Sequence, residues 1–138
     1  MKILLLQAAD YANVTRDGKL NIMGIFSEIN APNFPARHPS MHLVIKIGAE
    51  LGEFNQTRML VVNLQDADGN ETMNLSGPIA IPQIEGGRIP EINAILELKD
   101  IVFPKPGPYR FIVLVDKDYK DDLTIYVNKT DAPNTEKR

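Results

Sequence analysis

The segment YRFIVLV, residues 109–115, shows the two-residue period that decides the fold. Its alternate positions carry large apolar side chains, namely Tyr109, Phe111, Val113 and Val115. Successive side chains of a strand point to opposite sides, so these four share one face. The preceding PKPGP, residues 104–108, is a stiff approach to the strand. We therefore predict a core strand that begins at Tyr109.

The same period recurs along the rest of the chain. Seven further segments are apolar or alternate between apolar and polar side chains: KILLLQA (2–8), KLNIMGIFSEI (19–29), MHLVIKI (41–47), RMLVVNL (58–64), ETMNLSGPIAI (71–81), INAILEL (92–98) and LTIYV (123–127). Glycines and prolines between them are typical of the turns of β-proteins. No window of helical length keeps an apolar stripe at i, i+3 and i+4 free of Pro or Gly. The sequence predicts an all-β fold, a single antiparallel β-sandwich of about eight strands with immunoglobulin-like or C2-like topology.

One connection of this sandwich is long. The stretch NAPNFPARHPS, residues 30–40, contains three prolines and is unsuited to a central strand. In a Greek-key sandwich such a segment crosses from one sheet to the other. Phe34 is expected to fill an end of the core, and Phe34, Arg37 and His38 are also candidate contacts to a partner.

The composition limits the classes of function. The chain has 138 residues, a formal net charge of -3 and a pI of about 5.3, which argues against general nucleic-acid binding because that requires a basic surface. It has no cysteine, which excludes disulfides, thiolate zinc sites and cysteine nucleophiles. The apolar run Ile3–Leu6 is too short for a signal peptide, and no stretch approaches the roughly 18 residues of a membrane span. We expect a soluble, cytoplasmic protein with one domain over residues 1–128 and a polar, flexible tail over residues 129–138.

Two acidic stretches raise the question of a metal site. DADGN, residues 66–70, suits a hairpin turn, because an Asp caps a turn and Gly adopts positive φ. The alternative is a calcium site of a C2-like sandwich, which combines DADGN with DKDYKDD, residues 116–122. Its ligands would be Asp66, Asp68, Asp116, Asp118 and Asp121, and it requires both stretches at the same end of the sandwich. The turn is the favoured interpretation, and apart from calcium we expect no cofactor.

Signatures of catalysis are weak. The sequence contains neither a G-x-S-x-G nor an H-E-x-x-H motif, and EGGR, residues 85–88, lacks the GK[ST] ending of a phosphate-binding loop. His38 and His42 lie four residues apart, a spacing that suits a helix face, but a proline separates them. We expect no enzyme; a hydrolase built on these histidines is the most distant alternative.

The outer faces of the strands are unusually apolar. Opposite the core positions lie Val44, Met59, Val61, Ile95, Ile112 and Leu114, where a free sandwich usually carries polar residues. These strands are either central or covered, or they form a patch for dimerisation or partner docking. Pairing through an edge strand is a related route. The leading functional hypothesis is therefore a non-enzymatic protein-interaction module that associates with itself.

Four motifs in order resemble a family of short bacterial and phage-associated proteins with a domain of unknown function. They are ADYANVTRDGKLNIMGIF (9–26), FPARHPS (34–40), LQDADGN (64–70) and VFPKPGPYRFIVLVD (102–116). The resemblance covers nearly the whole chain and implies an all-β, sandwich-like domain. It implies no activity and supplies no catalytic residues. A phage-structural role or an accessory role in bacterial defence would suit it.

Overall fold

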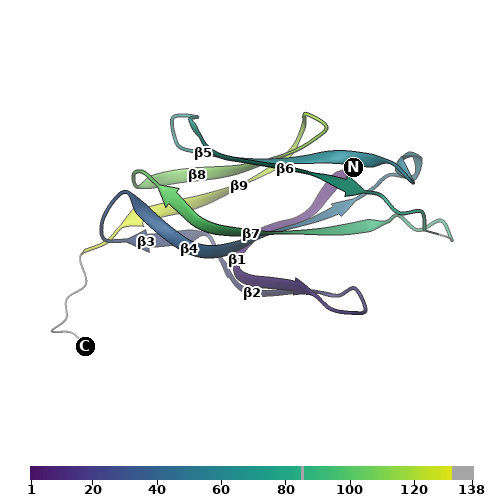
Figure 1. Cartoon of the computed structure of the whole chain (residues 1–138), viewed down its shortest axis with the longest axis horizontal. Helices are drawn as coiled ribbons and strands as arrows, with labels where there is room; N and C mark the ends of the chain where they lie inside the picture. The colour runs from purple at the N-terminus through teal and green to yellow at the C-terminus, as the bar shows by residue number, and fades with distance from the viewer. Residues whose placement is uncertain (85, 132–138) are drawn as a thin grey trace.

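Figure 1 shows the computed structural model of the chain, which describes residues 1–84 and 86–131. Two β-sheets pack face to face. Sheet A contains, from edge to edge, β2 (Leu20–Phe26), β1 (Lys2–Val14), β4 (Ala36–Gly48) and β7 (Glu91–Phe103). Sheet B contains β3 (Glu28–Ala31), β9 (Asp118–Lys129), β8 (Gly107–Val115), β5 (Thr57–Gln65) and β6 (Glu71–Ala80). The all-β sandwich predicted from the sequence is confirmed, and one 3-10 turn, η1 (Leu51–Glu53), follows β4.

Over the described residues the sandwich has nine strands, and one strand pair is parallel. The extra strand arises because KLNIMGIFSEI, predicted as one strand, divides at Ser27 into β2 and β3. The two pieces join different sheets, and β3 pairs in parallel with β9 at the edge of sheet B. The other pairs are antiparallel. The predicted antiparallel sandwich therefore carries one short parallel pair at this edge.

The proline-rich crossing is shorter than its sequence indicates. The chain leaves sheet B after Ala31 and enters sheet A at Ala36, so the segment does cross between the sheets as predicted. Arg37 to Ser40 belong to β4 and pair with β7. Pro39 is tolerated there because β1 pairs with β4 only as far as His42, which leaves this end of β4 with a partner on one side.

The core lies between the two inner faces. On β8 the four positions of YRFIVLV that were predicted to point inward are at most 4% exposed. They face the inward residues of β4, which are fully buried: Met41, Leu43, Ile45 and Ile47. Burying each such side chain contributes roughly 1.5–3 kcal/mol, which makes this layer the main source of stability.

Tyr109 fixes the connection between the two sheets. Its hydroxyl donates to the Lys105 carbonyl at 2.6 Å and accepts the Lys105 N–H at 3.3 Å. Its ring packs edge-on against Phe103 at the end of β7, with the ring centroids 4.9 Å apart. One side chain therefore holds the end of β7, the PKPGP segment and the start of β8 together.

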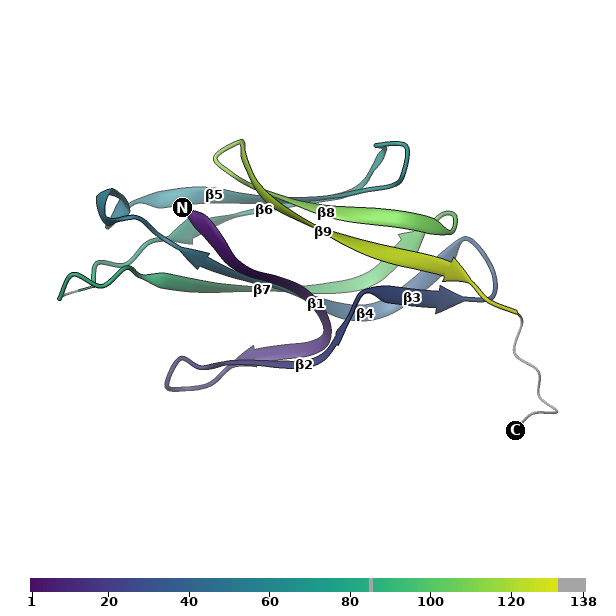
Figure 2. The same cartoon turned by 180° about the vertical axis from the view of Figure 1, so that it is seen from behind.

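The β1–β2 hairpin projects from the body of the sandwich. β1 pairs with β4 through Ala9 and with β2 from Ala8 to Val14, so its second half leaves β4 behind (Figure 2). Gly24, in β2, has a φ of 69° and lies against the Asp10 side chain, where a Cβ would meet Asp10 Oδ2 at 2.5 Å. Only glycine fits this combination of positive φ and close approach.

The last strand continues past the predicted domain boundary. Lys129, assigned to the tail by the sequence, pairs with Ala31, and the Thr130 N–H donates to the Ala31 carbonyl at 3.0 Å. Residues 132–138 of the predicted tail lie outside the described residues. No helical segment of residues 1–84 and 86–131 combines the length and the apolar composition that crossing a membrane requires.

Candidate functional site

The two acidic stretches lie at opposite ends of sheet B. DADGN connects β5 to β6, next to the end of β5 that pairs with Arg110. DKDYKDD forms the turn between β8 and β9 and the first residues of β9, and its turn lies next to the other end of β5 (Figure 1). Leu60 to Gln65, the stretch of β5 that pairs with β8, spans roughly 17 Å at the usual rise per residue. The cup that a shared calcium ion would need is therefore not formed.

Asp66 makes DADGN a self-contained hairpin turn. Its Oδ1 accepts the backbone N–H groups of Asp68 and Asn70, each at 2.9 Å. These bonds, chiefly the one from Asn70, hold the pKa of Asp66 below its ordinary value. Gly69 supplies the positive φ, and Lys105 Nζ lies 2.6 Å from Asp68 Oδ2. Each carboxylate already has a partner within the protein.

At the other end of sheet B, the carboxylate of Asp116 also has hydrogen-bond partners within the protein. Its Oδ1 accepts the Met59 N–H at 2.8 Å, and its Oδ2 lies 3.0 Å from Arg58 Nη1. The Met59 N–H first, and then Arg58, lower the pKa of Asp116. Asp121 Oδ1 accepts the Asp122 N–H, and Asp118 begins β9. The part of the chain that the structure describes contains no group of three or more side chains suited to holding a metal.

Arg58 also belongs to an ion-pair network at the start of β5. Glu53 of η1 lies 3.3 Å from Arg58 Nη2 and 3.0 Å from the Met1 ammonium, and its Oε1 accepts the Glu50 N–H at 2.8 Å. Burial alone would raise the pKa of Glu53, but the Glu50 N–H and the two positive charges outweigh it and lower the pKa. The network fastens η1 to sheet B.

The two histidines do not form a pair. His42 Nδ1 lies 3.2 Å from the Asp10 carbonyl oxygen, and its ring packs edge-on against Tyr11, with centroids 5.1 Å apart. His38 instead packs against Phe26. Four residues along β4 separate them by roughly 13 Å, too far to share a metal ion or a reacting atom. The hydrolase arrangement has no geometric support here.

The outer-face residues predicted as partner contacts are largely covered. Val44 is 0% exposed, because it lies in β4 between Gln7 of β1 and Ile95 of β7. The others are only partly exposed: Val61, Ile95, Ile112 and Leu114. In the crossing, Phe34 packs against the core and Arg37 is exposed. Of the two explanations offered for the apolar outer faces, Val44 therefore fits the first, a covered position on a central strand.

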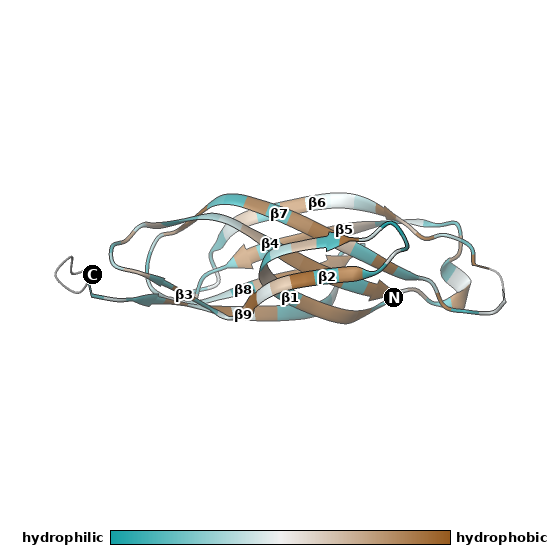
Figure 3. Cartoon of the chain, turned by 90° about the horizontal axis from the view of Figure 1, so that it is seen from below, coloured by the Kyte–Doolittle hydropathy of each residue, from teal (hydrophilic) through white to brown (hydrophobic). Residues whose placement is uncertain are grey.

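The more accessible apolar surface lies at β2. Met23 is 62% exposed and Ile25 57%, and both lie on the outer face next to Tyr11 of β1, which is 47% exposed. Figure 3 colours most of β2 as hydrophobic. Among the described residues, β2 pairs with β1 on one side and with no strand on the other. An apolar strand with a free edge is a typical site of association.

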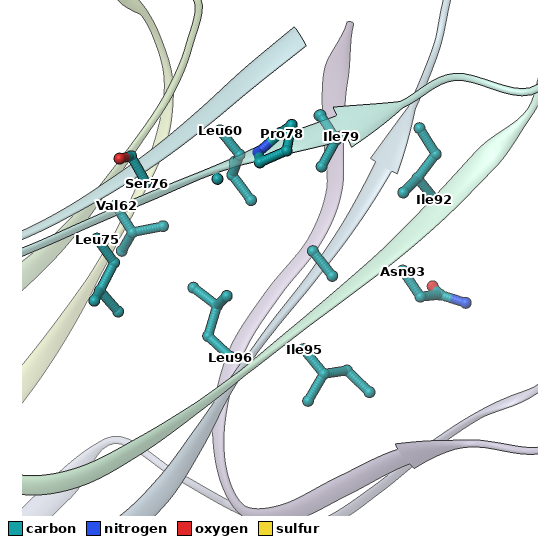
Figure 4. Close-up of a pocket in the computed structure, with 12 residues that line it drawn as sticks. Leu60, Val62, Leu75, Ser76, Pro78, Ile79, Ile92, Asn93, Ile95 and Leu96 are labelled. Carbon is teal, nitrogen blue, oxygen red and sulfur yellow. The ribbon is translucent and has the colours of Figure 1, made fainter. Parts of the chain in front are cut away.

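An apolar groove opens at the opposite side of sheet A. It has a volume of about 410 Å³ and lies between β7 (at Ile92 to Leu96) and β6 (at Leu75 to Ile79). Figure 4 shows side chains of both strands on the two sides of the groove. Leu60 and Val62 of β5 also line it, so the groove reaches the edge of the core.

The profile of a family described as a family of unknown function (DUF6941) matches residues 4–128. The chain belongs to this family. The uncharacterised family inferred from the ordered motifs is thereby confirmed. No curated protein matches the chain. The description of DUF6941 names no reaction and no ligand, so the candidate site in this member rests on the geometry of β2 and of the groove.

Sequence analysis missed β2 in this DUF6941 chain and named only Ile95 among the residues of the groove, although each surface has a local signal. From Leu20 to Phe26 the sequence has no charged residue. In β6, Gly77 stands opposite the buried Leu60, at a position where a core strand normally carries a large side chain. The first signal marks an edge that is not protected by charge, and the second marks a site where another backbone approaches.

Proposed function

We propose that this chain is a non-enzymatic protein-interaction module that binds a second copy of itself through β2. The observation that carries the proposal is the free, uncharged edge of β2 with Met23 and Ile25 exposed beside it. A strand that pairs along this edge satisfies the open backbone groups and covers both side chains.

The position of β2 at the edge of sheet A contributes to its exposure. Val44 and Ile25 both point outward from sheet A, yet Val44 is 0% exposed and Ile25 is 57% exposed. β4 has neighbours on both sides and β2 on one. A second neighbour for β2 would remove part of the exposed area of Met23 and Ile25 from water.

The exposed apolar side chains supply part of a standard interface. If each side chain offers about 200 Å² in full, then Met23, Ile25 and Tyr11 together expose roughly 330 Å², about 40% of the ~800 Å² that one partner buries in a standard interface. The backbone edge and the flanking residues of the hairpin would have to supply the rest.

The strand arrangement supports an immunoglobulin-like topology. The order β1-β4-β7 corresponds to strands A, B and E of that fold, and β9-β8-β5-β6 corresponds to G, F, C and C′. The Tyr109 hydroxyl, bonded to the backbone four residues upstream, corresponds to the tyrosine corner at the start of strand F. Such domains commonly serve in recognition, although the fold by itself does not define a function.

The carboxylates with lowered pKa values also favour a non-enzymatic role. Asp66 and Asp116 accept backbone N–H groups of their own turns, and Glu53 holds η1 to Arg58. These groups stabilise the fold in the ionised state, which accounts for their lowered pKa values without a catalytic role.

The experiment is light scattering over a wide range of protein concentration. The wild type is expected to exceed the monomer mass of 15.4 kDa, and the double variant Met23→Lys/Ile25→Lys is expected to remain monomeric. Loss of their burial should weaken association at least tenfold, because each side chain contributes roughly 1.5 kcal/mol or more. The matched control is Leu51→Lys/Met59→Lys, which adds the same charge at exposed apolar residues outside β2.

The control variant should associate like the wild type. A wild type that stays monomeric at several hundred micromolar would refute the proposal. Equal association by the two double variants would show that the contact lies elsewhere on the surface.

A further inference from the structure

In the described part of the chain, sheet A has two free edges. β2 forms one edge and β7 the other, and within the described residues β7 pairs only with β4. Every second residue of β7 therefore turns its N–H and C=O groups toward the open side. The groove between β6 and β7 lies along this open side, where one more strand of sheet A would fit.

The groove is uncharged, and its floor leaves space for the side chains of another strand. No charged side chain lines it among the described residues. Gly77 stands at an inward position of β6, opposite Leu60, and a Cβ built there meets no atom within 4 Å. Leu60, Val62 and Ile79 are nearly covered already, so the space in front of Gly77 is the part that remains open. This space suits alternate aliphatic side chains of an added strand.

β2 has the matching composition. Of the nine strands in the described part of the chain, β2 is the one without a charged residue. Its inward positions Leu20, Ile22 and Phe26 share the face of sheet A that points to the core, and its seven residues exceed the five of β7 that line the groove. Uncharged strand and uncharged groove avoid the cost of burying an unpaired charge.

The strand directions are compatible with simple repetition. β1 is antiparallel to β2 and to β4, and β4 is antiparallel to β7, so β2 and β7 run in opposite directions. A second copy placed beside the first in the same orientation therefore brings its β2 antiparallel to β7. Sheet A then continues from one copy into the next.

The flanking charges favour one register. In a continuous sheet, residues paired across two strands point to the same face, so an inward residue of β2 must pair with an inward residue of β7. This rule allows Ile22 of the second copy to pair with Ala94. In this register Lys19 of the second copy, next to the start of β2, stands opposite Glu97 of β7. Opposite charges thus meet at one end of the uncharged segment.

We infer that β2 of one copy occupies the groove between β6 and β7 of another copy, so that the chain associates head to tail. This inference rests on the proposed function and specifies the partner surface of β2. Such a contact is heterologous, so each copy keeps one free donor strand and one free groove, and the assembly grows with concentration unless it closes into a ring. A symmetric pairing of two β2 strands would stop at the dimer.

The test uses a donor variant and a groove variant. The donor variant is Met23→Lys/Ile25→Lys. The groove variant is Gly77→Arg, which places a charge in the groove where the fold has room for the side chain. Its control is Gly52→Arg, another glycine without positive φ whose Cβ meets no atom within 4 Å. Thermal melts establish that all variants are folded, and light scattering with native mass spectrometry measures assembly.

Each variant alone is expected to be monomeric, with association weakened at least tenfold, whereas Gly52→Arg assembles like the wild type. An equimolar mixture of donor and groove variants is expected to form a one-to-one heterodimer of twice 15.4 kDa, because one intact β2 and one intact groove remain. Wild-type assembly by Gly77→Arg, or a mixture that stays monomeric, would overturn the head-to-tail contact while self-association through β2 stands. A monomeric wild type would overturn both.

Discussion

Replacing Tyr109 by Phe tests the connection that joins the two sheets. The change removes one oxygen and keeps the ring, so the packing against Phe103 and the apolar burial are preserved. It leaves the Lys105 carbonyl without the 2.6 Å bond and the Lys105 N–H without the longer 3.3 Å bond. A typical buried hydrogen bond contributes about 0.5–1.5 kcal/mol, and an unsatisfied partner adds to the loss. We expect Tyr109→Phe to lower the free energy of unfolding by about 1–2 kcal/mol.

The assay is urea unfolding followed by circular dichroism, with the free energy obtained by linear extrapolation. For a chain of this size the same loss lowers Tm by roughly 3–8 °C. All variants are compared at one protein concentration, because self-association raises the apparent stability of the folded state.

Tyr126→Phe is the matched control. Tyr126 is 51% exposed, so water replaces its hydroxyl contacts and the change should stay within about 0.5 kcal/mol. A Tyr109→Phe variant as stable as Tyr126→Phe would refute the assignment of the Lys105 bonds as the link between β7 and β8.

Three further outcomes are expected. Millimolar calcium should leave Tm unchanged relative to chelator; a rise of several degrees that is lost in Asp66→Asn/Asp68→Asn would establish the calcium alternative instead. Because the pKa of Glu53 is lowered in the folded state, its contribution to stability is complete above its ordinary value of 4.5 and is lost as pH falls through the lowered pKa. When the pH is lowered below about 4.5, the urea concentration at the midpoint of unfolding should therefore decrease, and it should decrease less steeply in Arg58→Met. Equal pH dependence in the wild type and in Arg58→Met would contradict the ion pair between Glu53 and Arg58. Gly24→Ala should cost about 1–3 kcal/mol in urea unfolding, and an unchanged midpoint would contradict the close approach in β2.

Strands with a regular period could be predicted from the sequence. YRFIVLV and MHLVIKI carry apolar side chains at every second position, and the structure buries those positions. The division at Ser27 could not be predicted, because the alternation of KLNIMGIFSEI continues through it. The chain changes sheets there because Ile29 packs in the core beside β9, and that pairing joins residues almost 100 positions apart.

The candidate site was harder to predict than the fold. The sequence identified DADGN as a hairpin turn by local chemistry, since Asp and Gly act within four residues of each other. Accessibility is not local. Val44 and Met23 both occupy outward positions of apolar strands, but Val44 is covered because β4 is central and Met23 is exposed because β2 is an edge. Strand order decides which of the two can meet a partner, and strand order depends on contacts between distant segments.

The edges of the two sheets also differ in how they are protected against association. The two edges of sheet B have prolines or charges: β6 contains Pro78, and β3 begins at Glu28. Such residues keep an exposed edge from pairing with other chains. On β7 the charged residues Glu91, Glu97 and Lys99 lie on either side of the groove-lining stretch and leave Ile92 to Leu96 uncharged. β2 has neither a charge nor a proline over its seven residues, and it exposes Met23 and Ile25 beside its open backbone. An edge that only faced water would tolerate lysine at either position at little cost. The absence of protection at this one edge is explained if another strand covers it in the assembled protein.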